Sequence, residues 1–236
     1  MQMIFDMYDP DQAGYNKIDE TSSEETDDPH LPGGALLKEQ RTHQQYRLID
    51  LTLFAVMLAA FESLVVTAGI RWFPGEAYLV SVTAVITAIV MMRWGVWAAL
   101  HAVLGGAVTC LAAGMAEGRF LAVYCVGNLG ALLALALREK MGPESIRQSV
   151  WRTLLFGAAV LLGMQAGRAA VCLALTGRAD ALTMFFAPEA VTMLFTLVVL
   201  WIARRIDGLF EDQGHYLKRM RQQFAREEAE EEGGSQ

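Results

Sequence analysis

The chain has 236 residues, 54% of them hydrophobic, and a formal net charge of −7. The acidity is concentrated at the two ends: residues 1–32 carry nine acidic side chains and one lysine, and residues 207–236 carry eight acidic and four basic side chains. Residues 33–206 are therefore net cationic, at +5, and hold six long apolar stretches, which excludes an ordinary soluble domain.

The acidic N-terminal segment is predicted to be disordered. It mixes Asp, Glu, Ser, Thr and Pro with few bulky apolar groups, so it cannot bury enough surface to offset its ordering entropy. It lacks the basic and apolar regions of a cleavable signal peptide, so the first membrane helix is expected to direct insertion. We place this tail at residues 1–35, followed by a polar, basic lead-in at Leu36–Arg47.

The six apolar stretches predict an all-α bundle of six transmembrane helices over residues 36–206. About 20 apolar residues are needed to cross a bilayer, and the second and fourth stretches are short by this measure. The stretches are Leu48–Ile70, Ala77–Met92, Trp94–Met115, Phe120–Leu137, Val150–Leu175 and Leu182–Ile206.

The connections between these stretches differ in kind. Arg71–Glu76 joins a turn dipeptide to two aromatic residues, which indicates either an interfacial turn or a lid over a pocket. The connection at Arg93 is almost absent, which predicts a tight hairpin. Arg138–Arg152 is the longest and most basic connection.

Basic residues orient the bundle. If the N-terminus is cytoplasmic, ten Lys or Arg residues flank the spans on the cytoplasmic side and three lie outside, which follows the positive-inside rule. Six crossings then return the C-terminus to the cytoplasm, and the expected location is a bacterial cytoplasmic membrane.

The C-terminal residues 207–236 form a separate cytoplasmic segment in this interpretation. Leu209, Phe210, Tyr216 and Met220 lie in a segment, 208–226, that also holds Lys218, Arg219 and Arg221, which predicts an amphipathic helix on the membrane surface or against a partner. The Glu-rich end, 227–232, is expected to be a solvated tail.

Polar groups inside the spans are the candidate ligand contacts. Arg168, Gln165, Glu189 and Asn128 all fall in the outer halves of their stretches, by the 1.5 Å rise per residue. Arg168 suits a carboxylate or phosphate, and Glu189, beside Pro188, suits an amine or ring N–H. The structural alternatives are snorkelling of Arg168, mutual neutralisation of Arg168 and Glu189, and interhelical hydrogen bonding by the two amides.

Other polar groups are weaker candidates. His101, in the inner third of its stretch, is more typical of a packed, hydrogen-bonded side chain than of a proton relay. Asp50 and Arg152 lie at inner helix ends and are expected to be interfacial. Cys110, Cys125 and Cys172 have no metal-ligand spacing, so they indicate apolar packing rather than a metal site.

The chain resembles the substrate-binding S component of energy-coupling-factor (ECF) transporters over about residues 45–220. The features that carry the resemblance are Ala55-x-x-x-Ala59 in the first stretch, the aromatic outer loop, the short second stretch and the turn Met91-Met92-Arg93-Trp94-Gly95. The run from Arg205 to Gln213 is similar to the ending of a subset of these proteins from anaerobic Gram-positive bacteria.

The resemblance implies capture of a vitamin-like micronutrient at the outer face. The coupling partners would be a transmembrane protein, docked at Ala55 and Ala59, and two ATPases. The pocket would map onto residues of the first outer loop and the outer helix halves: Arg71, Trp72, Asn128, Gln165, Arg168 and Glu189. Glu62 shares a helix face with Ala55 and Ala59, so it is expected to face the coupling protein rather than the ligand.

No enzyme motif stands out: HExxH, GxSxG, a P-loop and paired metal-binding glutamates are all missing from the sequence. We expect no catalytic activity in this chain, no cofactor, no metal and no nucleic acid. Two other functions stay open at this stage. One is a non-transporting six-span scaffold similar to a cell-shape factor, and the other is a stand-alone secondary transporter, although no inverted repeat is apparent.

Overall fold

The computed structural model describes residues 33–74, 80–177, 190–206 and 208–214, together with residues 180, 185, 216 and 219. The chain divides into two units, residues 1–43 and 44–236, and the candidate site and its supporting contacts lie within the second. Of the disordered tail predicted at residues 1–35, residues 1–32 lie outside the described residues, and residues 33–35 are helical, which differs from the prediction. The acidic end 227–232 also lies outside the described residues.

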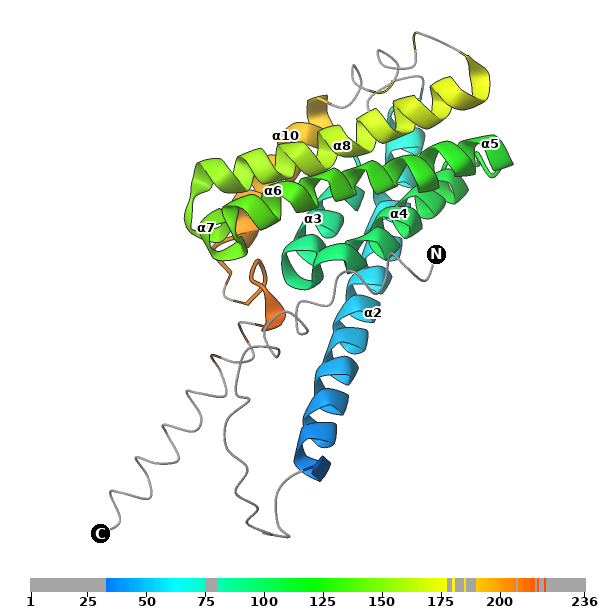
Figure 1. Cartoon of the computed structure of the whole chain (residues 1–236). Coiled ribbons are helices and arrows are strands. Elements are labelled where there is room, and N and C mark those ends of the chain that lie inside the picture. Colours follow the sequence, from blue (N-terminus) through cyan, green and yellow to red (C-terminus); the bar gives the residue numbers. More distant parts are fainter. Residues whose placement is uncertain are drawn as a thin grey trace, which may run out of the picture. The chain divides into compact units, whose positions relative to one another are not determined.

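All the described elements are helical (Figure 1). In chain order they are α2 (Gly33–Trp72), α3 (Thr83–Trp94), the 3₁₀ turn η1 (Gly95–Trp97), α4 (Ala98–Ala112), α5 (Gly118–Leu121), the π-helical η2 (Ala122–Val126), the 3₁₀ segment η3 (Asn128–Leu133), α6 (Ala134–Met141), α7 (Pro143–Gln148), α8 (Val150–Thr176) and α10 (Ala190–Ala203).

Within the part of the chain that the structure describes, four helical segments are long and apolar enough to cross a membrane, which indicates an integral membrane protein. They are Gln44–Trp72, Thr83–Ala112, Gly118–Met141 and Val150–Thr176, and a shorter apolar helix covers Val191–Ala203. The predicted all-helical class is therefore confirmed, while the count of six spans is not. The fifth predicted stretch, Val150–Leu175, agrees with α8 to within one residue.

The segment Thr83–Ala112 reverses direction at Gly95. Gly95 has a φ of 59° and a ψ of −121°, which favours glycine, and its N–H donates to the carbonyl of Met91. The arms α3 and α4 then pack side by side, so closely that a Cβ on Gly105 would overlap the side chain of Thr83. The tight hairpin predicted around Arg93 is confirmed. Its arms, of 12 and 15 residues, are each shorter than a typical crossing.

Helix α3 lies at the centre of the packing. Every residue from Thr83 to Arg93 is buried, and Val90, Met91 and Met92 have no exposed surface. A helix that is apolar on all sides belongs in an interior, and α3 has β-branched or Met side chains around its whole circumference. It contacts α4, α8 and α10. Contacts that fix the two ends of α3 therefore also fix the position of the helix against which α4, α8 and α10 pack.

Glycines bring α8 into backbone contact with the helical segment Gly118–Met141. A Cβ added at Gly130 would collide with the carbonyl of Gly163, and one added at Gly167 would collide with the carbonyl of Gly127. The two helices run alongside each other in Figure 1. Small residues permit this approach, because van der Waals packing rather than hydrophobicity associates helices in a membrane. The glycine seam (Gly127, Gly130, Gly163 and Gly167) thus determines which side chains meet across it.

Candidate functional site

Arg168 on α8 is buried, with 5% of its surface exposed, and is surrounded by polar and aromatic groups. Its Nε donates to Oδ1 of Asn128 at 2.7 Å, and Nη1 lies 3.4 Å from Oε1 of Gln165. The guanidinium carbon lies 4.7 Å from the centroid of the Tyr124 ring, a cation–π contact. Three of the predicted site residues, Arg168, Asn128 and Gln165, are therefore brought together.

Asn128 is oriented by a break in regular helix geometry. It follows directly after the π-helical η2 and Gly127, and begins the 3₁₀ segment η3. Its Nδ2 donates to the carbonyl of Ala102 at 2.9 Å, which leaves Oδ1 directed at Arg168. A Cβ on Gly127 would lie 2.6 Å from the Cα of Arg168. A π-helical turn inside an α-helix is often found at a functional site, and this one contributes Tyr124.

A small cavity lies beside this cluster. It has a volume of about 10 Å³ open to the centre of a water molecule, which is room for about one water. Three helices contribute to its wall, and the lining residues are Ser81, Ala84, Leu161, Met164, Gln165, Arg168 and Thr192. We call the end of the bundle that holds this cavity the cavity end, and the opposite end, which holds Gly95, the turn end.

Ser81 and Thr192 were not singled out from the sequence. Ser81 lies two residues before the buried run that starts at Thr83, one position outside the N-cap Val82, and a serine near the start of a helix is a common capping signal. That signal was available, but it indicates a helix start rather than a ligand contact. Thr192 carries no pattern of its own, because a threonine in an apolar helix is ordinary.

Glu62 is buried completely and caps α3, which corrects the expectation that it faces a coupling protein. Its carboxylate accepts the backbone N–H groups of Val82 and Thr83 at 2.8 and 3.1 Å. The hydroxyls of Ser81 and Thr109 also donate to it, at 2.9 and 2.8 Å. The free N–H groups and positive dipole at a helix N-terminus attract a carboxylate, so Glu62 turns into the bundle.

The remaining predicted pocket residues are not joined to the cluster. Arg71 and Trp72, at the end of α2, are exposed, and Trp72 retains 72% of its surface. Glu189 and the adjacent Pro188 lie outside the described residues, so the suggested pairing with Arg168 does too. His101 is buried and its Nε2 lies 3.0 Å from the carbonyl of Leu51, which confirms the packed interpretation.

The predicted docking residues Ala55 and Ala59 are half-buried. They lie on α2 beside a buried stripe that contains Leu51, Phe54 and Leu58. Their other neighbour, Val56, is 62% exposed. The two alanines therefore stand at the edge between the face that packs on the bundle and the face that does not.

Asp50 anchors the turn end of α3. Its carboxylate forms a two-pronged ion pair with Arg93, with Oδ1 to Nη2 and Oδ2 to Nε both 2.8 Å. Nε1 of Trp94 donates to the same carboxylate at 2.5 Å. The side chains of Arg93 and Asp50 are only 9% and 12% exposed. The sequence predicted only that Asp50 lies at the membrane interface. The structure adds a specific partner, Arg93, which sequence spacing did not indicate.

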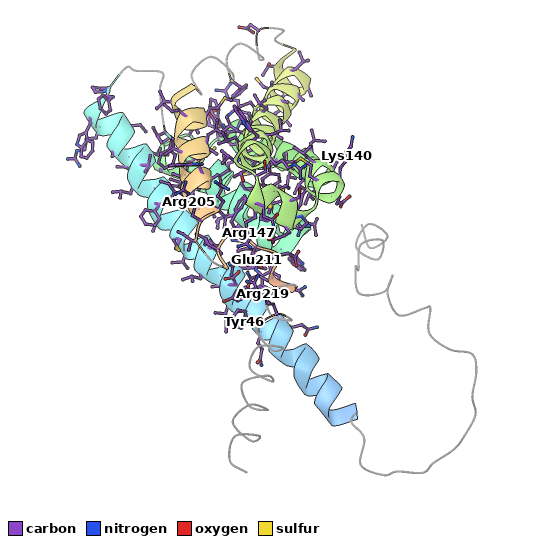
Figure 2. All side chains as sticks on the ribbon, turned by 90° about the vertical axis from the view of Figure 1, so that its left-hand side faces the viewer. Tyr46, Lys140, Arg147, Arg205, Glu211 and Arg219 are labelled. Carbon is purple, nitrogen blue, oxygen red and sulfur yellow. The ribbon has the colours of Figure 1, made fainter. Side chains whose placement is uncertain are left out.

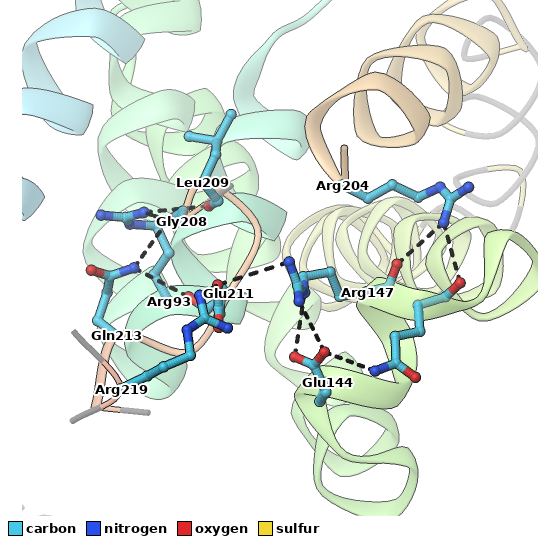
Figure 3. Close-up of polar contacts among 10 residues, drawn as sticks. Arg93, Glu144, Arg147, Arg204, Gly208, Leu209, Glu211, Gln213 and Arg219 are labelled. Carbon is cyan, nitrogen blue, oxygen red and sulfur yellow. Dashed lines mark hydrogen bonds and ion pairs between the residues drawn. The ribbon is translucent and has the colours of Figure 1, made fainter. Parts of the chain in front are cut away.

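Residues 208–213 cross the turn end and seal it, and we call them the strap. Arg93 also donates to the carbonyls of Gly208 and Leu209, as Figure 3 shows. Phe210 has no exposed surface and meets the Phe156 ring edge-on, at 6.3 Å between centroids. The described part of the predicted amphipathic helix therefore differs from expectation: helix begins at Gln213, and the residues before it form buried turns.

Ion pairs bind the strap to the basic connection. Arg138 pairs with Asp212 at 2.6 Å. Glu211 lies between Arg147 and Arg219, at 3.9 and 2.9 Å (Figures 2 and 3). Arg147 also donates to Glu144, a hydrogen bond that lowers the pKa of that carboxyl. Two cationic side chains of the longest connection, Arg138 and Arg147, thus bind acidic side chains of the strap.

The chain was compared with protein-family models, curated proteins and solved structures. No family model matches the chain, and neither the curated proteins nor the solved structures contain a significant match.

Proposed function

We propose that this chain is the substrate-capture subunit of an ECF-type importer. It would bind a vitamin or related micronutrient from outside the cell and leave ATP hydrolysis to partner subunits. The observation that carries the proposal is the buried Arg168, Asn128 and Gln165 cluster beside a cavity, in helices long and apolar enough to cross a membrane. An arginine buried inside a membrane-length helix is energetically costly, so Arg168 is by default a candidate functional residue.

The proposed topology has six crossings, with both termini in the cytoplasm. The hairpin of α3 and α4 would supply the second and third crossings, and α10 the sixth. The cavity end would then face outward, and the turn end, with Arg93, Arg138 and Arg147, would face the cytoplasm, in accord with the positive-inside rule.

Arg168 is the proposed anion contact. Asn128 and Tyr124 hold its guanidinium in one orientation, and an oriented guanidinium matches the planar geometry of a carboxylate. Because ligand pockets for small molecules usually measure about 300–1,000 Å³, a vitamin needs far more room than the cavity of about 10 Å³ provides. Binding therefore requires the helices around the cavity to separate.

A ligand screen tests the proposal. Purified protein is warmed with each member of a panel of water-soluble vitamins, and a rise in the unfolding temperature identifies a ligand. Arg168→Gln should abolish the rise, while Arg119→Gln should preserve it, because Arg119 is 66% exposed and pairs locally with Glu117. A ligand whose effect is identical in both variants would contradict the assignment of Arg168.

Docking is tested separately. In the proposal, a transmembrane coupling protein packs on the edge of α2 marked by Ala55 and Ala59. Ala55→Trp should abolish co-purification with the coupling subunit and leave ligand binding intact. Leu64→Trp is the control, since Leu64 is 64% exposed on the same helix. Equal co-purification of both variants would contradict docking at this edge.

A non-transporting membrane scaffold is the second candidate. The small cavity favours it, because the polar cluster then serves to join α8 to η3 and no ligand has to enter. In that case no vitamin shifts the unfolding temperature, and both Arg168→Gln and Asn128→Leu lower it. Co-purification with proteins of cell-wall synthesis or division would support this function.

A further inference from the structure

Three threonine hydroxyls are buried without a hydrogen-bond partner among the described residues: that of Thr83, which packs against Gly105 of α4, and those of Thr87 and Thr196. Thr87 on α3 and Thr196 on α10 both have 0% of their surface exposed, and neither Oγ1 has a partner. Leaving a buried hydroxyl unpaired costs about 1–3 kcal/mol. Two such groups on neighbouring helices indicate a place where a polar group of a ligand can be bound.

Both hydroxyl-bearing residues lie directly below the cavity. Ala84 on α3 and Thr192 on α10 line it, and both helices run from the cavity end towards the turn end. Thr87 follows Ala84 by three residues and Thr196 follows Thr192 by four, so each lies one turn further in on the same helix face. The helices α3 and α10 contact each other. From this contact and the matching one-turn offsets, we infer that the two threonines lie at one level of a shared seam.

The wall from α8 completes the seam. Gln165 and Arg168 lie at the level of the cavity, and Leu161, which also lines it, lies one turn closer to the turn end. Since Gly157 meets Leu197 and Leu200 of α10, α8 runs antiparallel to α10 at this level. The seam therefore has a cationic upper level, an apolar wall at Leu161 and Met164, and hydroxyls at its lower level.

We propose that this α3–α10 seam is the lower half of the ligand pocket. Its ligand is a small organic acid with its carboxylate at Arg168 and a second polar group, such as a hydroxyl or amide, at Thr87 and Thr196. One helical turn separates the two levels, so the two ligand groups lie about 5–6 Å apart. The inference rests on the proposed function, because it names the ligand class of that same site.

Stability of the protein without added ligand is the first test. Thr87→Val and Thr196→Val replace an unpaired hydroxyl by a methyl group of similar size, so neither should lower the unfolding temperature. The matched control is Thr153→Val, because the equally buried Thr153 hydroxyl donates to the carbonyls of Ile146 and Ser149 at 2.7 and 3.1 Å. Its replacement should lower the unfolding temperature. If the Thr87 and Thr196 variants fall as far as the control, these hydroxyls are bonded inside the protein and the proposal is wrong.

Binding of simple acids is the second test, measured by ligand-detected NMR titration with 5-hydroxypentanoate and pentanoate as probes. The wild-type protein should bind the hydroxy acid about fivefold more tightly, which is the effect of about one net hydrogen bond. Thr87→Val with Thr196→Val should erase this preference while pentanoate binding persists. Arg168→Gln should weaken both probes.

The outcomes separate the two proposals. Equal binding of the two probes by the wild-type protein, with loss of both in Arg168→Gln, would retain the Arg168 site and overturn the seam. If neither probe binds the wild-type protein, the acid-binding class is wrong. A vitamin that still depends on Arg168 in the thermal screen would then show that the capture function survives without it.

Discussion

Asp50 and Glu62, both on α2, hold opposite ends of α3. Glu62 accepts the first backbone N–H groups of α3, and Asp50 pairs with Arg93 in its last turn. Twelve residues of helix rise about 18 Å, which is both the spacing of the two acids and the length of α3. One helix therefore sets the depth of another through two carboxylates, and the central helix cannot slide along α2 without breaking both sets of contacts.

The cap at the cavity end should be essential for stability. Glu62→Gln keeps the shape but replaces one of the two acceptor oxygens by an NH₂ group and removes the charge at the helix N-terminus. The four donors from Val82, Thr83, Ser81 and Thr109 then converge on a group with a single acceptor oxygen. We expect a loss of about 1–3 kcal/mol, because a buried donor is left unpaired. Thermal unfolding in detergent measures it. Glu117→Gln, at a 64% exposed acid, is the control, and an equal effect of both changes would contradict the capping role.

The ion pair at the turn end should show strong coupling. Asp50→Asn and Arg93→Gln should each cost about 3–5 kcal/mol, because each leaves a nearly buried charge without its partner. The double variant should be much less destabilised than the sum of the two. The exposed pair of Glu117 and Arg119 provides a reference cycle, in which coupling should stay at about 0–1 kcal/mol. Additive losses at Asp50 and Arg93 would show that the pair is not a unit.

The glycine seam should reject even one methyl group. Gly163→Ala forces a Cβ against the backbone of Gly130, so we expect a loss of about 1–3 kcal/mol from overpacking. The shift also moves Asn128 relative to Arg168, so any ligand of Arg168 should bind more weakly. Gly118→Ala is the control, because a Cβ there meets nothing within 4 Å. Unfolding temperatures that agree between the two variants would rule out close backbone packing.

The strap should contribute to stability through one side chain above all. Phe210→Ala empties a site with no exposed surface against Phe156, for which we expect a loss of about 3–5 kcal/mol. Phe61→Ala is the matched control, since Phe61 is 48% exposed on α2 and its truncation opens no internal cavity. If Phe210→Ala unfolds at the wild-type temperature, residues 208–213 do not seal the turn end.

The sequence predicted a helical membrane protein and the polar residues of the candidate site, because both features depend on local composition. Runs of apolar residues predict membrane-length helices in any tertiary context, and α8 agrees with its predicted range almost residue for residue. The turn at Gly95 could also be predicted, because a polar residue and a glycine interrupt an apolar run there. Arg168, Gln165 and Asn128 stand out as costly polar groups in the same way.

Tertiary structure decided how these parts meet, because contacts between distant segments leave no periodic trace. Helix periodicity placed Glu62 on one face with Ala55 and Ala59, but only packing showed that the Glu62 side chain turns inward to cap α3 while the two alanines stay half-buried. The pairing of Asp50 with Arg93, and of Arg138 with Asp212, joins residues far apart in the chain. By itself, the sequence determined a helical membrane protein with a buried cationic site. The backbone contact at the glycine seam determined which amide orients that cation, because it brings Asn128 next to Arg168.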